Sequence, residues 1–176
     1  DGLGTLVCQG PTLERSNPDY SRGELESYLC KHLEAQRILW LEHSQTPRFI
    51  NANTLVYDAC DDPQDERYLQ LQALHSELDK LCDTHGQAYQ LAPLPLPQPI
   101  RNTQGELLPA SYCDFLITNK QVFVPQFNDE GDSLALHSMQ KLCADRDIVP
   151  VNCLALSRIK GSLHKASLNL FAEITY

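Results

Sequence analysis

The chain has 176 residues, which is enough for one domain and barely for two. Apolar residues make up 42% of the sequence and charged residues 21%, a balance that excludes a disordered, collagen-like or coiled-coil chain. The net charge of −9 at pH 7 argues against partners that need a basic surface, so we expect neither nucleic acid nor an anionic membrane to bind. The same charge favours a cationic partner.

Seven cysteines are spread along the chain without a C-x-x-C pair, and several lie in apolar runs such as VNCLAL at 151–156. We therefore expect buried, reduced thiols rather than disulfides or a zinc site. The six histidines show no metal-ligand spacing either, and no metal is predicted. No apolar stretch reaches the ~18 residues of a membrane span and no signal peptide precedes Asp1, so we expect a cytoplasmic protein.

Three repeats follow one another along the sequence, each with a β-rich run, an amphipathic helix and a second apolar run. They cover approximately residues 1–44, 45–99 and 108–156, and a short closing strand is expected at 161–174. Such β-β-α-β modules cannot bury their helices alone, so we expect an α/β fold in which they pack around a common axis, with sheets inside and helices outside. The chain is expected to form a single domain, whose ring of modules is incomplete.

In the first repeat, the runs 4–8 and 37–41 are predicted strands, and residues 21–34 are a predicted helix. Ser21 and Glu24 have the spacing of a capping box, in which the two side chains satisfy the free amide groups at a helix start.

The second repeat opens with a predicted hairpin over 49–59, because asparagines in its middle tolerate the left-handed backbone of tight turns. A helix is predicted over 63–83, after a capping aspartate and a proline at its first position. Residues 88–97 are a second apolar run, but prolines favour an extended loop over 91–99.

The third repeat opens with a predicted hairpin over 112–127 that turns at Asn119 and Lys120. A helix over 132–144 follows, and a further apolar run covers 148–156. The apolar residues of the helices recur at helical spacing, which indicates buried faces rather than cofactor sites.

Residues 108–153, LPASYCDFLITNKQVFVPQFNDEGDSLALHSMQKLCADRDIVPVNC, are similar to a pattern with the runs L-P-A-S-Y-x-N-F and V-P-Q-F-x-D, from which they depart at Asp114. Residues 161–170, GSLHKASLNL, are similar to a closing G-x-x-H-C-x-T motif. Residues 1–7 and 53–78 are similar to the entry of an earlier module and to a strand, acidic turn and helix. Over almost its whole length the sequence resembles the agmatine deiminase and bacterial peptidyl-arginine deiminase family.

The resemblance implies a five-bladed α/β propeller, the pentein fold, and a hydrolase that acts on a guanidinium group without a cofactor. In such an enzyme a cysteine thiolate attacks the guanidine carbon, ammonia leaves and water releases a ureido product, while a histidine moves protons. The implied substrate is agmatine, converted to N-carbamoylputrescine for putrescine synthesis, or the arginine side chain of a peptide. The oligomeric state stays open, with a homodimer among the options.

The nucleophile position departs from the family, because Lys165 stands where the motif has cysteine. A lysine near its usual pKa of ~10.4 is a cation at neutral pH, neither nucleophilic nor favourable beside a guanidinium. Deep burial would lower that pKa, but an amine adduct with the substrate carbon would be another guanidine with no easy route onward. We therefore expect a chain that is inactive, or a pseudoenzyme that binds a cationic ligand without chemistry.

Two further family segments have no match. A D-x-H-x-D motif is missing where residues 39–44 pass directly to 45–51, and His43 beside this break is interpreted as an exposed loop histidine. A W-x-x-D-x-G-P stretch of the N-terminal modules is absent as well. We therefore expect the sequence to be the C-terminal part of a longer protein, with segments left out.

Three other residues are candidates for the site. His164 matches the histidine of the closing motif, so it is expected to line the site or to support its loop. Asp114 takes the place of the family's asparagine, where it either contacts the substrate or holds a strand end. Gly161 either lets the backbone approach the substrate closely or forms a plain turn.

Overall fold

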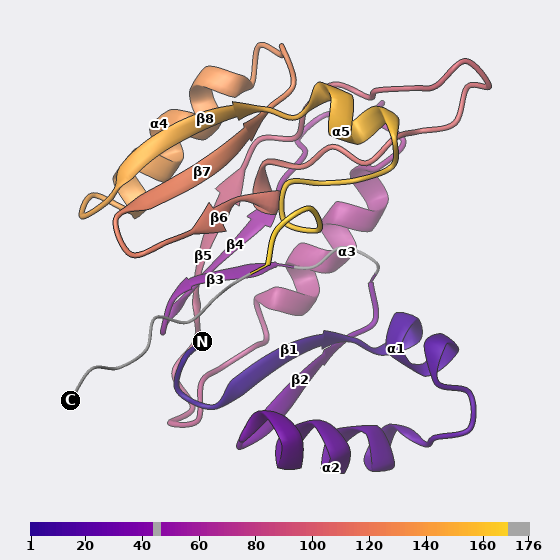
Figure 1. Ribbon diagram of the computed structural model, residues 1–176. Coiled ribbons are helices and arrows are strands. Elements are labelled where there is room, and N and C mark those ends of the chain that lie inside the picture. Colours follow the sequence, from indigo (N-terminus) through magenta and orange to yellow (C-terminus); the bar gives the residue numbers. More distant parts are fainter. Residues whose placement is uncertain (44–46, 169–176) are drawn as a thin grey trace. The chain divides into compact units, whose positions relative to one another are not determined.

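The computed structural model describes residues 1–43 and 47–168. Its contacts divide the chain into two compact units, residues 1–95 and 96–176, and each unit is described by itself. Helices and strands alternate along both units, so the expected mixed α/β class is confirmed (Figure 1).

The first module of unit 1 has two parallel strands, β1 (Thr5–Gln9) and β2 (Arg37–Leu41), in the expected places. Between them lie α1 (Gly10–Ser16), which was not predicted, and α2 (Arg22–Leu33). The capping box that predicts α2 is confirmed: the N–H of Ser21 donates to Glu24 Oε2 at 2.8 Å, and Ser21 Oγ accepts the N–H of Glu24 at 3.4 Å.

The second module contains the predicted hairpin, β3 (Arg48–Asn51) and β4 (Thr54–Asp58), followed by α3 (Tyr68–Leu78) and β5 (Gln90–Leu94). β4 is the central strand, antiparallel to β3 and parallel to β5. All five residues of β4 are buried, which is the environment of a central strand covered on both faces.

The predicted start of α3 at residue 63 is wrong by five residues. Residues ahead of the helix form turns, because aspartate side chains accept backbone N–H groups two positions on. Asp62 Oδ1 accepts the N–H of Gln64 at 2.9 Å, and Asp65 Oδ1 accepts the N–H of Arg67 at 2.8 Å. Such local bonds compete with helix formation and delay its start.

The loop expected from residue 91 is also wrong in its first part, because β5 extends to Leu94 and includes Pro93. The N–H of Gln90 donates to Asn53 O at 2.8 Å, so residue 90 faces β4. Residue 93, three positions on, faces the opposite edge. A proline there removes no bond of the β4–β5 ladder, which explains why the outer strand tolerates it.

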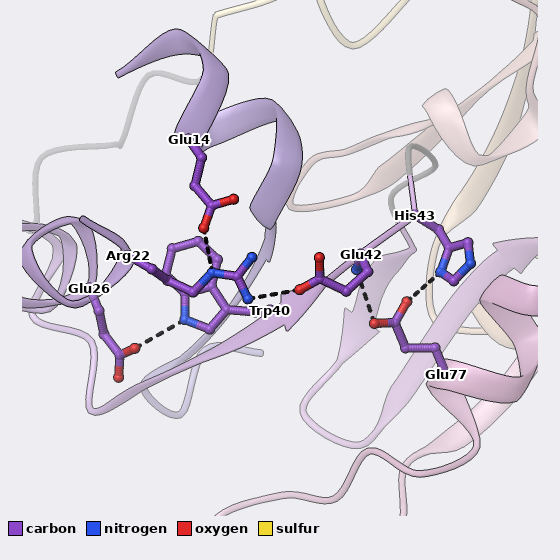
Figure 2. A network of polar contacts seen from close by, with 7 residues as sticks. All are labelled: Glu14, Arg22, Glu26, Trp40, Glu42, His43 and Glu77. Carbon is purple, nitrogen blue, oxygen red and sulfur yellow. Dashed lines mark hydrogen bonds and ion pairs between the residues drawn. The ribbon is translucent and has the colours of Figure 1, made fainter. Parts of the chain in front are cut away.

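A polar network at the end of β2 connects it with three helices of unit 1 (Figure 2). Arg22 contacts Glu14 at 2.6 Å and Glu42 at 2.7 Å. The N–H of Glu42 donates to Glu77 Oε1 at 3.0 Å, and His43 Nδ1 lies 2.8 Å from Glu77 Oε2. The interpretation of His43 as an exposed loop residue is therefore wrong, because its half-buried ring is paired with a carboxylate of α3.

Unit 2 contains the third module, whose predicted hairpin, helix and strand are confirmed. A short 3₁₀ helix η1 (Tyr112–Asp114) leads into β6 (Leu116–Ile117) and β7 (Gln121–Gln126), and α4 (Asp132–Leu142) and β8 (Asp147–Asn152) follow. β7 is central, antiparallel to β6 and parallel to β8. α4 packs on β7 and β8, where Ala135 and Met139 are fully buried (Figure 1).

The end of the apolar run at 148–156 turns out to be helical, because α5 (Leu154–Arg158) follows β8 after one residue. Residues 161–168 contain a turn at 163–166 and no strand, and the rest of the expected 161–174 strand lies outside the described residues. The N–H of Ala166 donates to Ser162 O at 3.0 Å. This local bond bends the backbone out of the extended form that a strand needs.

Among the helices within residues 1–43 and 47–168, none is long and apolar enough to cross a membrane.

Leu71 and Leu69 lie on the same helix, α3, and test its packing as a matched pair. Leu71 is 1% exposed and Leu69 is 79% exposed. Replacing Leu71 with alanine should lower the free energy of unfolding by about 2–5 kcal/mol, because it leaves a cavity. Leu69→Ala should change it by less than about 0.5 kcal/mol. Urea denaturation of both variants measures this, and equal losses would contradict the burial of Leu71.

Candidate functional site

A shallow pocket in unit 2 lies where the loops beside η1, β7 and β8 meet, and its empty volume of about 170 Å³ includes open solvent. It holds no enclosed space large enough for a water molecule, so it is a depression of the surface rather than a ligand cavity. Two of the predicted site residues, Asp114 and Gly161, line it together. The full lining consists of Pro109, Ala110, Asp114, Pro125, Phe127, Cys153, Ser157, Gly161, Ser162 and Leu163.

Asp114 is held at the pocket by the η1 turn. Ser111 caps this turn, because its Oγ accepts the N–H of Cys113 at 2.9 Å. Asp114 is the last residue of η1 and is half-buried, one residue before the fully buried Phe115. The pocket therefore has a carboxylate set among largely apolar neighbours, where a charge interacts more strongly than it does in water.

Tyr112, at the start of η1, is fully buried and fixes this turn to α4. Its hydroxyl donates to Asp132 Oδ1 at 2.7 Å and lies 3.4 Å from Asp129 Oδ1. Asp132 Oδ1 also accepts the N–H of Phe127 at 3.0 Å, which ties the end of β7 to the same point. Burial, and then the hydrogen bond to Asp132, raise the pKa of Tyr112, so its hydroxyl stays a donor at physiological pH.

Gly161 closes the turn that follows α5. Its N–H donates to Leu156 O at 2.9 Å, and the preceding Lys160 has a left-handed backbone with φ of 58°. A Cβ atom added at Gly161 would lie 3.4 Å from Leu156 O, at ordinary contact distance. The geometry is that of a turn, and this turn places Gly161 in the pocket wall.

His164 and Lys165 lie on the same turn but are exposed, and neither side chain belongs to the lining of the pocket. The N–H of Lys165 donates to Ser162 Oγ at 3.4 Å, and Ser167 Oγ donates to His164 O at 2.7 Å. Unit 2 therefore brings Asp114 and Gly161 together and leaves the other two candidates at its surface.

Cys153 lines the pocket too, a position that the sequence analysis did not assign to it. The residue is 1% exposed and follows the carboxyl end of β8, a place where parallel sheets commonly carry site residues. Burial raises the pKa of its thiol, and the nearby Asp114 raises it further. Cys153 is thus a protonated thiol at neutral pH.

The pocket as described offers a carboxylate, a protonated thiol and backbone groups. Within residues 1–43 and 47–168, no three His, Cys, Asp or Glu side chains are grouped so as to hold a metal ion. A carboxylate in a partly apolar wall can hold a cation, but the wall of unit 2 has no thiolate to attack it.

The bond between Tyr112 and Asp132 can be tested by removing the hydroxyl. Tyr112→Phe should lower the free energy of unfolding by about 1–3 kcal/mol, because it removes a partner of the half-buried Asp132 carboxylate. Tyr28→Phe is the control, since Tyr28 is 60% exposed and should change stability by less than about 0.5 kcal/mol. Chemical denaturation compares them, and a Tyr112→Phe protein as stable as the original would show that the bond contributes nothing.

Residues 1–170 match the family model of the Porphyromonas-type peptidyl-arginine deiminases. Among curated relatives, a Lactococcus lactis protein is 32% identical and the agmatine deiminase of Pseudomonas fluorescens is 28% identical. Both alignments cover 93% of this chain and 53% of the relative, so the chain spans about half the length of these relatives.

Solved structures agree with the sequence relationship. A Porphyromonas gingivalis structure superposes with a TM-score of 0.90 at 35% identity, covering 94% of this chain and 52% of that one. The agmatine deiminase of Enterococcus faecalis gives a TM-score of 0.86 at 27% identity, covering 94% and 53%. An agmatine deiminase variant of C. jejuni with substrate bound gives 0.85 at 27% identity, covering 93% and 51%. The chain therefore belongs to the family of agmatine deiminases and Porphyromonas-type peptidyl-arginine deiminases.

Proposed function

We propose that the chain forms part of the substrate site of a guanidine hydrolase of the agmatine deiminase type. The observation that carries this proposal is the pocket of unit 2, where the turns after Ser111 and after α5 bring Asp114 and Gly161 into one wall. Each residue belongs to one of the two motifs that resemble the family, and Asp114 and Gly161 are 47 positions apart in the sequence. A carboxylate in such a wall suits the planar cation of agmatine.

The reaction proposed for the complete enzyme converts agmatine and water to N-carbamoylputrescine and ammonia, a step toward putrescine. It needs a nucleophile that adds to the guanidine carbon and a general acid for the departing amine. In this chain Lys165 occupies the position that the motif gives to the nucleophile. Its side chain is exposed, and a lysine is a cation at neutral pH. We therefore propose that the chain with lysine at this position does not turn over.

The length of one alignment supports a second proposed difference from the complete enzyme, the absence of the segment that carries the central histidine. The L. lactis relative aligns over 195 positions, more than the 176 residues of the chain, so it has residues that this chain lacks. The sequence places one such loss at the break beside His43, where the family motif D-x-H-x-D is expected. The central histidine and two carboxylates of the complete site would then be absent as well.

The architecture proposed for the complete protein is the five-bladed α/β propeller, with the modules of both units as blades of one catalytic domain. The support is the shared strand order of the second and third modules, each with an antiparallel hairpin and a parallel third strand. A cytoplasmic location and a homodimer remain part of the proposal. The arginine side chain of a peptide stays the alternative substrate, since the matching family model is named for peptidyl-arginine deiminases.

A second function, binding without chemistry, is favoured by the state of the side chains around the pocket. Cys153 is a protonated thiol and Lys165 is an exposed cation, so neither is a nucleophile at neutral pH. The carboxylate of Asp114 nevertheless remains able to attract a cation. A pseudoenzyme of this kind would bind agmatine or a similar cation and release it unchanged.

Ammonia release from agmatine tests the proposed enzyme. The 176-residue chain should release no more ammonia than a sample without protein. Lys165→Cys in a chain completed with the segments of its relatives should release ammonia, because a thiolate then occupies the nucleophile position. The matched control is Lys160→Cys in the same completed chain, which should stay inactive. Turnover by the original chain, or none by Lys165→Cys, would contradict the proposal.

Calorimetric binding of agmatine tests the role of Asp114. Asp114→Asn keeps the size of the side chain but removes its charge, and the affinity should fall about tenfold, which corresponds to the ~1.4 kcal/mol expected for one moderately screened contact. Asp145→Asn is the control, because its side chain is 71% exposed and lies outside the pocket. An unchanged affinity for Asp114→Asn would show that Asp114 only holds the strand end.

A further inference from the structure

Two cysteines of the first module, Cys8 in β1 and Cys30 in α2, lie outside the pocket of unit 2. Both are free thiols, and both are half-buried, so a small solute can reach them. Half-burial is shared by Cys82 alone among the other cysteines of the described residues, since the remaining four are buried. The thiols of Cys8 and Cys30 are therefore candidates for chemistry that the proposed hydrolase does not use.

The sheet of the first module places Cys8 beside Trp40. β1 and β2 pair in parallel, and Cys8 lies opposite Trp40 in their register. Neighbouring strands are ~4.8 Å apart, and paired residues project their side chains on the same face of the sheet. The contacts of Trp40 therefore show what covers the face that carries Cys8.

Helix α2 covers this face of the sheet. Trp40 Nε1 donates to Glu26 Oε2 at 3.0 Å (Figure 2). The guanidinium carbon of Arg22 lies 5.1 Å from the centroid of the Trp40 ring. Because both contacts come from α2, this helix packs over the side chains of Trp40 and its neighbour Cys8.

Cys30 belongs to the row of α2 that makes these contacts. Arg22, Glu26 and Cys30 follow one another at a spacing of four residues, which places their side chains on one face of a helix. All three are half-buried, whereas Ser27 and Lys31, one position further on, are exposed. Cys30 is thus on the face of α2 that is turned toward the sheet.

The direction of α2 brings the thiol of Cys30 toward that of Cys8. Arg22 contacts Glu14 at 2.6 Å and Glu42 at 2.7 Å, two residues that come after the carboxyl ends of β1 and β2. α2 therefore begins at these ends and runs back along the sheet. Side chains of a helix lean toward its own start, so Cys30 leans toward the strand ends, where Cys8 is the last residue but one of β1.

The electrostatic behaviour of the two thiols agrees with this placement. Burial raises the pKa of Cys8, and the neighbouring Cys30 raises it further. Such an effect falls off with distance, so the two sulfur atoms lie close to each other. The pKa of Cys143 and that of Cys153 are raised as well, but there the charged neighbours are carboxylates and a guanidinium rather than a second thiol.

We propose that Cys8 and Cys30 are a redox-sensitive pair, which forms a disulfide between β1 and α2 by exchange with a small-molecule disulfide. The thiolate of one cysteine attacks a sulfur of the small disulfide, and one small thiol leaves. The thiolate of the other cysteine then attacks the protein sulfur of this mixed disulfide, and a second small thiol leaves. The protein loses two electrons and two protons, and the small disulfide is reduced to two thiols.

The bond holds α2 on the sheet, because it closes the loop that contains α1 and most of α2. Without an oxidant both thiols stay reduced, as expected for a cytoplasmic protein, in which disulfides are usually transient. The proposal concerns the first module and does not depend on the guanidine chemistry.

The test incubates the folded 176-residue chain with oxidised glutathione, blocks the remaining thiols with iodoacetamide and maps the peptides without a reductant. A disulfide needs Cβ atoms ~3.5–4.5 Å apart, so a folded chain allows few pairs. We expect the Cys8–Cys30 pair to be at least about tenfold more abundant than any other, and dithiothreitol to remove it. The same chain in urea should lose this preference. Glutathione adducts without the pair, or a different dominant pair in the folded chain, would overturn the proposal.

Two variants and hydrogen exchange complete the test. Cys30→Ser should leave Cys8 as a mixed disulfide with glutathione, because no second thiol displaces it. Cys82→Ser is the matched control, since Cys82 is also half-buried in unit 1, and it should still form the Cys8–Cys30 bond. Amides of α2 should exchange at least about tenfold more slowly in the oxidised chain than in the reduced chain. Unchanged exchange after oxidation would contradict the proposal that the bond holds α2 on the sheet.

Discussion

The hydroxyl of the buried Tyr112 and the half-buried carboxylate of Asp132 form a hydrogen bond of 2.7 Å in unit 2, and the position of the η1 turn depends on it. Either group alone would be costly to bury, whereas together each satisfies the other. Tyr112 begins η1, which carries Asp114, and Asp132 begins α4, which packs on the sheet. One bond thus fixes the carboxylate of the pocket wall relative to β7 and β8.

Charge determines what this wall can do. In the proposed function Asp114 supplies a negative group for a cationic substrate, while the burial of Cys153 keeps its thiol protonated. Lys165, at the motif position of the nucleophile, is exposed and positive. In the proposed function, binding and chemistry are therefore separable. The carboxylate proposed to bind a guanidinium lies in unit 2, and the proposed loss of activity follows from Lys165 together with the histidine segment that the resemblance implies and the chain lacks.

Sequence patterns predicted the fold best where a few neighbouring residues decide the structure. The capping box of Ser21 and the hairpins of the second and third modules are of this kind, because their bonds connect residues within a few positions. The start of α3 was missed because the side chain of Asp65 competes for the N–H of Arg67, and this competition cannot be seen in an apolar repeat. Pro93 was assigned to a loop because its place in an outer strand is known only once the pairing is known.

In the candidate site, too, short motifs predicted some residues, whereas the positions of others depend on the fold. The two motifs selected Asp114 and Gly161, and the fold of unit 2 brings them together. Cys153 could not be assigned to the pocket from sequence, because its position depends on where β8 ends in the sheet. The exposure of Lys165 likewise depends on the turn formed with Ser162. The roles of Asp114, Gly161, His164 and Lys165 in substrate binding and catalysis stay predictions.

The central claim is that the pocket wall of unit 2 binds a guanidinium cation, and an NMR titration of the chain with agmatine tests it most directly. The account predicts saturable shifts of the backbone amides of Asp114, Gly161 and Ser162, three residues that line the pocket. Amides on α2, in unit 1, should not move. Agmatine that leaves these pocket amides unshifted at saturating concentration, or that shifts α2 instead, would contradict the account.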